Sequence, residues 1–356
     1  MKKILLSMAA IALLFTACDA DKNEINEDQS VKVDMSDFYV YTDTSDDLLS
    51  KPTKSKNKVK TCHTMNVLNK QLDANPGLAK KMYDIEYHTR SIIAAKGKPT
   101  KPGNGGGGNG GGGEEPTPVL GVINIPVNVI VVYSNSNENI SNAQISSQIA
   151  VLNDDFTKAN NDVNQAPSEF AGLAADSEIT FTLANTFRYS SSTTSWGTSN
   201  AVKNAYPPVS PETHLNIWVC NIGGGILGYA QFPGGNLDTD GVVCSPQYFG
   251  TTGYVQAPFD EGRTMTHEVG HYLNLRHIWG DGRCKQDDFV SDTPSSDGPN
   301  YGCPSYPTVN CKSNDMTMNY MDYVDDACMY MFSEGQKDRM RAIFASGGAR
   351  ESILLP

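Results

Sequence analysis

The sequence predicts an α+β fold, with helices layered on a β-sheet. Residues 122–133 are rich in Val and Ile and are typical of a buried strand. Strand-like runs follow at 179–183 and 215–220, and a segment with three of the six histidines comes after them. Between the first two strands, residues 141–159 favour an amphipathic helix. Its apolar residues recur at helical spacing: Ile145, Ile149, Leu152 and Phe156.

The N-terminus is typical of an export signal. MKKILLSMAAIALLFTAC has a basic start, an apolar run too short to span a bilayer, and small residues before Cys18. Its end resembles the lipobox of bacterial lipoproteins, which predicts a signal at 1–17 and a lipid on Cys18. The alternative is an ordinary cleaved signal with a chance cysteine. Both readings predict export, and the first predicts an anchor in the bacterial outer membrane or at the cell surface.

The chain then divides by composition. Residues 18–60 are polar and charged without an apolar period, which predicts a disordered tether. Residues 61–95 predict two helices, the second beginning at Pro76. Residues 96–117 are Gly-rich and predict a flexible linker, so that 118–356 forms the main domain. Because two short helices cannot bury a core alone, we expect them to pack on that domain.

Charge limits the choice of partners. The formal net charge is −12 and the pI is about 4.9, which argues against a nucleic-acid partner because such a partner requires a basic face. An acidic balance suits an extracellular protein, and we expect a monomer.

The segment HEVGHYLNLRH carries the strongest chemical signal. A spacing of four puts His267 and His271 on one helical face, where both imidazoles can bind one ion. Glu268 lies beside them. For His277 to reach the same ion the helix must end near Asn274, and Asn tolerates the left-handed backbone that such a turn requires. Three histidines and an acid predict a catalytic zinc site; a structural zinc site or a polar helix end is the alternative.

At this point HEVGHYLNLRHIWGD resembles the zinc signature of the metzincins, in particular the pappalysin family, with Asn274 where Gly is commoner. A second motif, MNYMDY, resembles the Met-turn, which implies that Met321 lies beneath the metal and Tyr323 beside it. The resemblance implies a zincin fold. It has a twisted mixed sheet and an active-site helix in the N-terminal subdomain, and an irregular disulfide-bonded C-terminal subdomain ending in a helix. We expect that final helix at 333–345, from its capping box.

The resemblance implies a secreted zinc endopeptidase acting on extracellular proteins and peptides. Glu268 is expected to be the general base, with Tyr323 stabilising the oxyanion. The extended stretch 228–232 resembles the edge strand on which a substrate adds as an antiparallel strand. Two alternatives remain: an inactive surface-binding lipoprotein on the same scaffold, and a zinc amidase acting on cell-wall peptides.

Seven cysteines follow Cys18. The resemblance implies the pairs Cys284–Cys311 and Cys303–Cys328, although the sequence alone permits three connectivities of these four. Cys220 and Cys244 are candidates for a third bridge. Cys62 is then left over, in a stretch that resembles the family's prosegment. This implies that its thiolate binds the zinc and keeps a zymogen latent until cleavage releases the mature form. A free thiol is the alternative, and His63 is a competing ligand.

The loop between the two motifs is rich in Asp. Oxygen-rich loops suit Ca²⁺, and relatives bind calcium here, so Asp281, Asp288 and Thr293 are candidate ligands; a solvated acidic loop is the alternative. After the Met-turn, the resemblance implies that Asp325 or Asp326 favours Arg or Lys just after the cut.

Overall fold

The computed structural model describes residues 33–44, 62–96 and 120–355. The predicted signal at 1–17, Cys18, most of the tether and the linker from residue 97 lie outside them. Within the described part, no helix is both long and apolar enough to cross a membrane.

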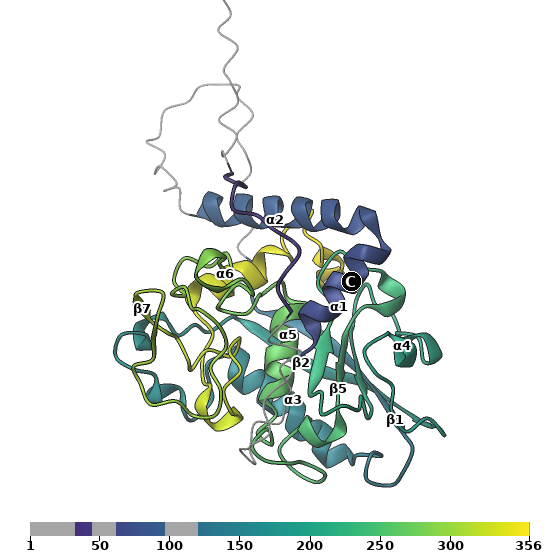
Figure 1. The fold of residues 1–356 in the computed structure, drawn as a ribbon. Coiled ribbons are helices and arrows are strands. Elements are labelled where there is room, and N and C mark those ends of the chain that lie inside the picture. The colour runs from purple at the N-terminus through teal and green to yellow at the C-terminus, as the bar shows by residue number, and fades with distance from the viewer. Residues whose placement is uncertain (1–32, 45–61, 97–119, 356) are drawn as a thin grey trace, which may run out of the picture. The chain divides into compact units, whose positions relative to one another are not determined.

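Five strands form one twisted sheet beside the central helix (Figure 1). The strands are β1 (Ile123–Tyr133), β2 (Ile179–Ser190), β3 (Leu215–Val219), β4 (Gly228–Ala230) and β5 (Val242–Cys244). Their order is β2-β1-β3-β5-β4, and all neighbours are parallel except β4, which runs antiparallel to β5. The predicted mixed sheet is confirmed, and β4 is its short edge strand.

The helices cover and close this sheet. The longer ones are α1 (Thr64–Ala74), α2 (Pro76–Lys96), α3 (Asn142–Phe156), α4 (Ala201–Ala205), α5 (Arg263–Tyr272) and α6 (Glu334–Ala342). Short 3₁₀ helices lie at Val163–Gln165, Ala171–Leu173, Leu237–Thr239, Pro246–Tyr248, Arg283–Lys285, Asp326–Cys328 and Glu351–Leu354. Ser141 caps α3 through its side chain, and the predicted capping box of Ser333 and Gln336 begins α6.

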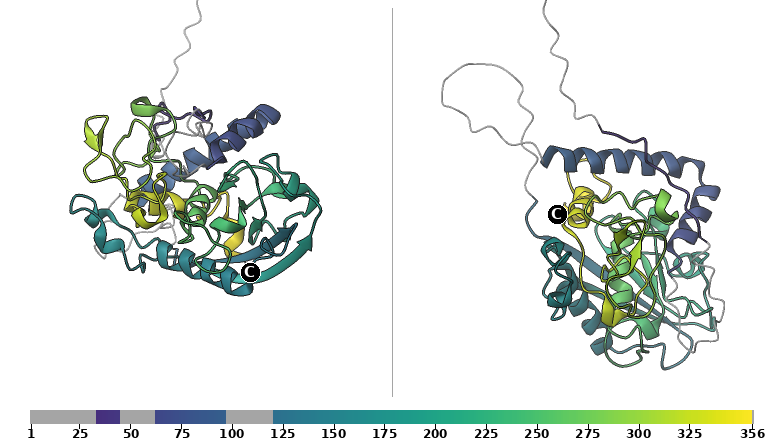
Figure 2. Two further views of the ribbon diagram at one scale, coloured as in Figure 1. Left: turned by 60° about the horizontal axis from the view of Figure 1, so that its bottom comes forward. Right: turned by 60° about the vertical axis from the view of Figure 1, so that its left-hand side comes forward.

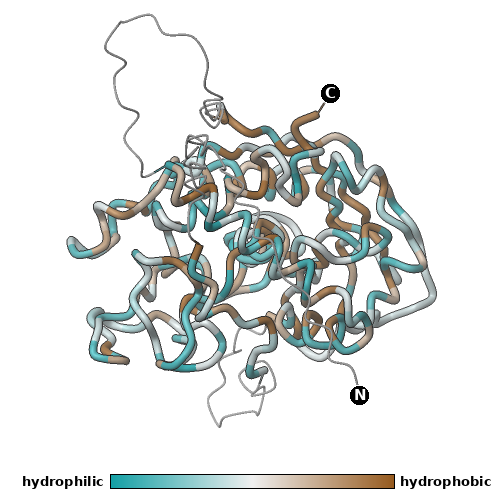
Figure 3. The backbone as a smooth tube through the Cα atoms, turned by 90° about the horizontal axis from the view of Figure 1, so that it is seen from above, coloured by the Kyte–Doolittle hydropathy of each residue, from teal (hydrophilic) through white to brown (hydrophobic). Residues whose placement is uncertain are grey.

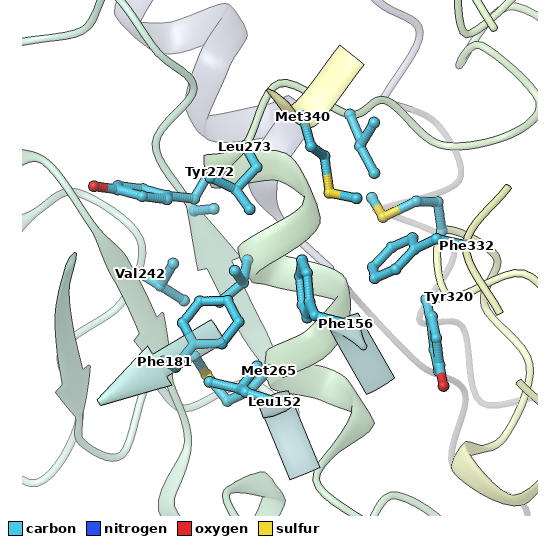
Figure 4. Close-up of a cluster of buried hydrophobic side chains, with 14 of the residues drawn as sticks. Leu152, Phe156, Phe181, Val242, Met265, Tyr272, Leu273, Tyr320, Phe332 and Met340 are labelled. Carbon is cyan, nitrogen blue, oxygen red and sulfur yellow. The ribbon is translucent and has the colours of Figure 1, made fainter. Parts of the chain in front are cut away.

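Helix α5 is the buried centre of the domain. All of its residues are buried, and α3, β4 and β5 contact it. Apolar side chains from α3, the sheet and α6 meet around it, among them Phe156, Phe181 and Met340 (Figure 4). The resulting core holds α5 rigidly, as a metal-binding helix requires.

The C-terminal region is irregular, with one small hairpin of β6 (Val309–Asn310) and β7 (Ser313–Asn314). Disulfides join Cys284 to Cys311 and Cys303 to Cys328, which are the two pairs that the resemblance implied.

The predicted third disulfide does not form, because Cys220 and Cys244 are buried thiols. They end neighbouring strands, yet Cys244 joins the core cluster around α5, whereas Cys220 joins a second cluster with Trp218. Their side chains therefore face opposite sides of the sheet and cannot be joined.

The two N-terminal helices pack on the main domain, as predicted. Helix α2 lies against α6 (Figures 1 and 2), and α1 contacts β4. Met65, Leu68 and Leu72 of α1 bury their side chains with Phe232, beyond the end of β4. Along the backbone of the described chain, hydrophobic and hydrophilic stretches follow one another closely (Figure 3), as expected for elements with one buried face.

Residues 33–44, which we call the N-terminal arm, differ from the predicted solvated tether. The Tyr39 hydroxyl donates to the carbonyl oxygen of Asp287, 2.8 Å away, and also contacts that of Gly280. The Tyr39 carbonyl accepts a hydrogen bond from Arg276. The arm has no apolar period, so only tertiary contacts hold it, and no local pattern predicts them.

Candidate metal centre

Three histidine side chains converge at the end of α5. Nε2 of His271 lies 3.2 Å from Nε2 of His267 and 3.2 Å from that of His277. The helix ends where the N–H of Leu275 donates to the Gly270 carbonyl, and Asn274 adopts φ 74° between them. The predicted left-handed turn at Asn274 is confirmed, and it reverses the chain so that His277 returns to the other two.

The other nitrogen of each ring is held by an acceptor. Nδ1 of His267 lies 2.7 Å from the carbonyl oxygen of Tyr320, and Nδ1 of His271 lies 2.8 Å from the carbonyl oxygen of Leu275. Nδ1 of His277 lies 2.5 Å from Oδ1 of Asp281. Carbonyls only accept, so Nδ1 carries the proton in the first two rings and the Nε2 lone pairs face one another.

Facing lone pairs repel unless a cation lies between them, so this arrangement fits a metal ion. Tetrahedral zinc with Zn–N bonds of about 2.0 Å separates its nitrogen ligands by about 3.3 Å, close to the 3.2 Å found. The Sγ of Cys62 lies 3.6 Å from Nε2 of His271, and a thiolate ligand in the same geometry would lie about 3.6 Å away. The four side chains are buried, and their ligand atoms lie within 4.8 Å of one another.

Two polar groups flank the histidines. An oxygen of Glu268, Oε2, lies 3.5 Å from Sγ of Cys62 and accepts a hydrogen bond of 2.7 Å from the Thr64 hydroxyl. That hydroxyl also accepts from the N–H of Ala230 in β4, at 2.8 Å. On the other side, the Tyr323 hydroxyl donates to the Cys62 carbonyl. Thr64 was not predicted as a site residue, because nothing in its local sequence pattern distinguishes it.

Two glycines allow neighbouring segments to approach closely at this site, and neither was predicted as a site residue. A Cβ on Gly270 would lie 2.5 Å from Sδ of Met321, so only glycine lets α5 lie this close to the Met-turn. A Cβ on Gly228 would lie 2.9 Å from Cγ of Glu268. The glycine within HEVGH was the one available sign of such close approach.

A buried network fixes the site from behind. Asp155 of α3 accepts hydrogen bonds from the hydroxyls of Tyr320 and Thr266, at 2.8 and 2.7 Å. Burial raises the pKa of Asp155 to about 6, against the opposing charge of Arg263. Because the Tyr320 carbonyl holds His267, Asp155 positions a metal-facing ring through one intermediary. Helical periodicity predicted α3 but gave no sign that its last turn faces the site.

The three candidate calcium ligands, Asp281, Asp288 and Thr293, have two different roles. Asp288 accepts from the Thr293 hydroxyl and from the N–H of Val290, so two of the calcium candidates meet. Burial raises the pKa of Asp288 well above its usual range, which is the environment that a bound cation would stabilise. Asp281, the third candidate, also orients His277 through Oδ1 of its carboxylate. An acid four residues after the third histidine was a readable sign of that role.

The two candidate specificity residues, Asp325 and Asp326, have different environments. Asp326 is fully buried, and its carboxylate accepts from the N–H groups of Glu261 and Arg263 at the start of α5. We therefore correct its assignment to a cap of the metal helix. Asp325 is half-buried, and its N–H donates to the Gly302 carbonyl.

Comparison with known proteins agrees with this geometry. The peptidase family described as pregnancy-associated plasma protein-A matches residues 208–345. Extracellular metalloprotease 1 of Coccidioides posadasii is 34% identical over 214 residues, covering 58% of this chain and 70% of that protein.

Solved structures are also similar. Mature mirolysin of Tannerella forsythia in complex with a cleaved peptide has 45% identity and a TM-score of 0.64, covering 66% of this chain and 97% of its own. A promirolysin variant from the same organism has 39% identity and a TM-score of 0.68, covering 83% and 97%.

A mixed sheet whose edge strand borders three convergent histidines, and relatives that are metalloproteases, define a metzincin metalloendopeptidase. The curated relatives are named extracellular, which supports export. The chain belongs to the pappalysin family.

Proposed function

We propose that the chain is an exported zinc endopeptidase made as a latent zymogen, in which Cys62 holds the metal position that catalysis needs. The observation that carries the proposal is the four-atom cluster of three Nε2 and one Sγ. The zymogen form is supported by the similarity to promirolysin over 83% of this chain. We call the N-terminal arm together with α1 and α2 the prosegment.

When bound by the three histidines, zinc would supply Lewis acidity towards water and the peptide carbonyl. The Glu268 carboxylate would take the proton of the attacking water and return it to the leaving amine. The Tyr323 hydroxyl would donate to the oxygen on which negative charge develops. Both side chains are buried beside the histidines, so they need little rearrangement to act.

Substrate binding is proposed at β4, as an added antiparallel strand. The proposal is supported by the position of β4 at the sheet edge and by the prosegment, which already uses its polar groups. The N–H of His63 donates to the Gly228 carbonyl, and the Ala230 N–H donates to the Thr64 hydroxyl. The prosegment pairs with β4 in the parallel direction, opposite to that of the proposed substrate.

Latency is proposed to act on three catalytic groups at once. The Cys62 thiolate would be the fourth ligand of the metal. The Thr64 hydroxyl donates a hydrogen bond to Glu268, and the Cys62 carbonyl accepts one from Tyr323. Cleavage between the prosegment and the catalytic domain would free all three. A lipid on Cys18 would leave with the prosegment, releasing a monomeric mature enzyme.

Two finer assignments accompany the main proposal. We propose a structural Ca²⁺ beside Asp288 and Thr293, supported by a buried carboxylate whose two oxygens both face the one Thr293 hydroxyl. We also propose a preference for Arg or Lys just after the cut, with Asp325 as the candidate carboxylate. That preference rests on the resemblance.

The test compares casein and peptide-library cleavage by the full-length protein before and after limited proteolysis of the linker. Wild type should be slow until it is cut. Cys62→Ala should be active before cutting, and Glu268→Ala should be inactive in both states while still binding one zinc. Unchanged latency in Cys62→Ala would reject the thiolate mechanism. A processed wild-type protein that binds zinc but cuts no substrate would reject the enzymatic mechanism.

A further inference from the structure

One buried arginine of the catalytic domain takes its counter-ion from the prosegment. Arg339 of α6 is 2% exposed, and its guanidinium forms a two-pronged pair with Glu86 of α2, at 3.0 and 2.8 Å. Its other hydrogen bonds go to the carbonyls of Asn274 and Phe289, each at 3.4 Å. Arg339 therefore loses its carboxylate partner, Glu86, when the prosegment leaves.

A second arginine, Arg276, depends on the prosegment in a similar way. It is 3% exposed, donates to the Tyr39 carbonyl at 2.8 Å, and lies 4.4 Å from the centre of the Tyr39 ring. The charge of Asp281 also acts on it. Nη1 of Arg276 and Nε of Arg339 are buried without a hydrogen-bond partner. Even with the prosegment in place, this surface retains donors that are not satisfied.

Phe289 of the catalytic domain packs on both arginines, and on Phe38 and Tyr39 of the N-terminal arm. Its ring centre lies 5.0 Å from the Arg276 guanidinium and 5.6 Å from that of Arg339. We call Arg276, Phe289 and Arg339 the arginine face. Other buried arginines of the domain differ, because Arg263 pairs with Asp162 and Arg350 with Asp240, both within the domain.

The arginine face adjoins the metal centre. A small cavity between it and the prosegment is lined on the enzyme side by Phe232, Asn274 and the arginine face itself. The Phe232 ring lies 5.5 Å from that of His271, and Asn274 is the turn before the third histidine. A peptide leaving the edge strand beyond Phe232 would therefore meet the arginine face.

We propose that the processed enzyme uses the arginine face to dock an acidic, aromatic-containing segment of its protein substrate, in the place that Glu86 and Tyr39 fill in the zymogen. A carboxylate would pair with the fork of Arg339, and an aromatic ring would stack on Arg276. This inference rests on the proposed function, since it needs an enzyme that has lost its prosegment.

The test uses full-length protein that has been processed and separated from its prosegment. Its substrates are peptides with one shared cleavage sequence, extended at either end by Phe-Glu-Glu or by the matched Phe-Gln-Gln. For wild type, kcat/KM should be about tenfold higher for one Glu peptide than for its Gln counterpart, mainly through KM, and the difference should fall with salt. Arg339→Gln should remove that difference without changing cleavage of the unextended peptide.

Arg188→Gln is the matched control, because Arg188 is an exposed arginine on β2 that bonds to Asn139 and Asn142. It should keep the preference for Glu. Equal rates on Glu and Gln peptides in wild type, or a preference that survives in Arg339→Gln, would overturn the proposal. If wild type cuts none of the peptides, the failure belongs to the proposed function and not to the arginine face.

Discussion

The hydroxyl of Tyr323 donates a hydrogen bond of 3.2 Å to the carbonyl oxygen of Cys62. A peptide carbonyl is also what a substrate would offer at this point, so the latent protein already displays the contact proposed for catalysis. The donor is fully used by the prosegment, and it becomes available only when the prosegment leaves.

Tyr323→Phe should therefore lower kcat of the processed enzyme by about 10- to 100-fold, with little change in KM, because the donor acts mainly on the developing oxyanion. The ring should still pack on Trp279, 4.9 Å away, so the melting temperature should change little. Steady-state kinetics on a short peptide measures the effect. An unchanged kcat would remove Tyr323 from the mechanism.

Thr64→Val should weaken latency while leaving Cys62 in place. The change removes the hydroxyl that joins Glu268 to the Ala230 N–H and leaves both groups buried without it. We expect faster activation of the full-length protein and unchanged kcat after processing, because Thr64 is no longer present. Thr42→Val in the arm is the control, since the hydrogen bonds between Thr42 and Asn69 use the backbone N–H and carbonyl of Thr42, which the change leaves in place. Identical activation of the two variants would contradict the role of Thr64.

Acid should loosen the prosegment through Glu86. Burial would raise the pKa of Glu86, but Arg339 and Arg90 lower it from 4.5 to about 2. A lowered pKa stabilises the docked state above pH 4.5, and this stabilisation is lost as the pH falls towards 2. The effect on docking is at most about 3 kcal/mol, because Arg90 stays beside Glu86 in the released prosegment.

Gel filtration of cut Glu268→Ala protein at a series of pH values measures the released prosegment. Glu86→Gln should release it already at pH 7. Asp84→Asn, which breaks only the exposed pair with Lys80 on the same helix, should behave as wild type. Retention of the Glu86→Gln prosegment would show that apolar packing of α1 and α2 is sufficient.

Asp155 should make the fold less stable as the pH rises from about 4 to about 6. Its pKa is raised to about 6 from 3.8, so the native state holds the proton more tightly than the unfolded chain, and that advantage disappears above pH 6. Asp155→Asn should flatten this part of the stability curve by up to about 3 kcal/mol. Urea unfolding at pH 4, 5, 6 and 7 measures it, and parallel curves for both proteins would contradict the assignment.

Calcium removal should destabilise the domain. A chelator should lower the melting temperature by about 5–10 °C, and added calcium, but not magnesium or zinc, should restore it. Asp288→Asn should remove the response, whereas Asp297→Asn, in an exposed part of the same loop, should keep it. A response equal in both variants would move the site away from Asp288.

The strongest local patterns could be predicted from the sequence. The helical spacing of the apolar residues from Ile145 to Phe156 predicted α3. The spacing within HEVGHYLNLRH predicted three convergent ligands and the turn at Asn274. Such patterns succeed because they depend on the geometry of one helix and one turn.

Features that join distant parts of the chain were missed. The pair of Glu86 and Arg339 spans 253 residues, and Tyr39 meets Asp287 across 248. Cys220 and Cys244 appeared suited to a bridge because sequence position does not reveal which face of a sheet a side chain takes. Asp326 was assigned to a pocket because nothing local shows that it reaches the start of α5.

The parallel pairing of Cys62 with Gly228 has a consequence for the lifetime of the latent protein. Reversing the chain direction exchanges the order of carbonyl and N–H groups along the added strand, so compared with the proposed antiparallel substrate the prosegment is a peptide inserted backwards. Its bonds would not meet Glu268 in the order that the proposed cleavage requires. With the proposed function, the protein would keep an inhibitor in its own cleft without cleaving it, and the timing of activation would depend on whatever cuts the chain elsewhere.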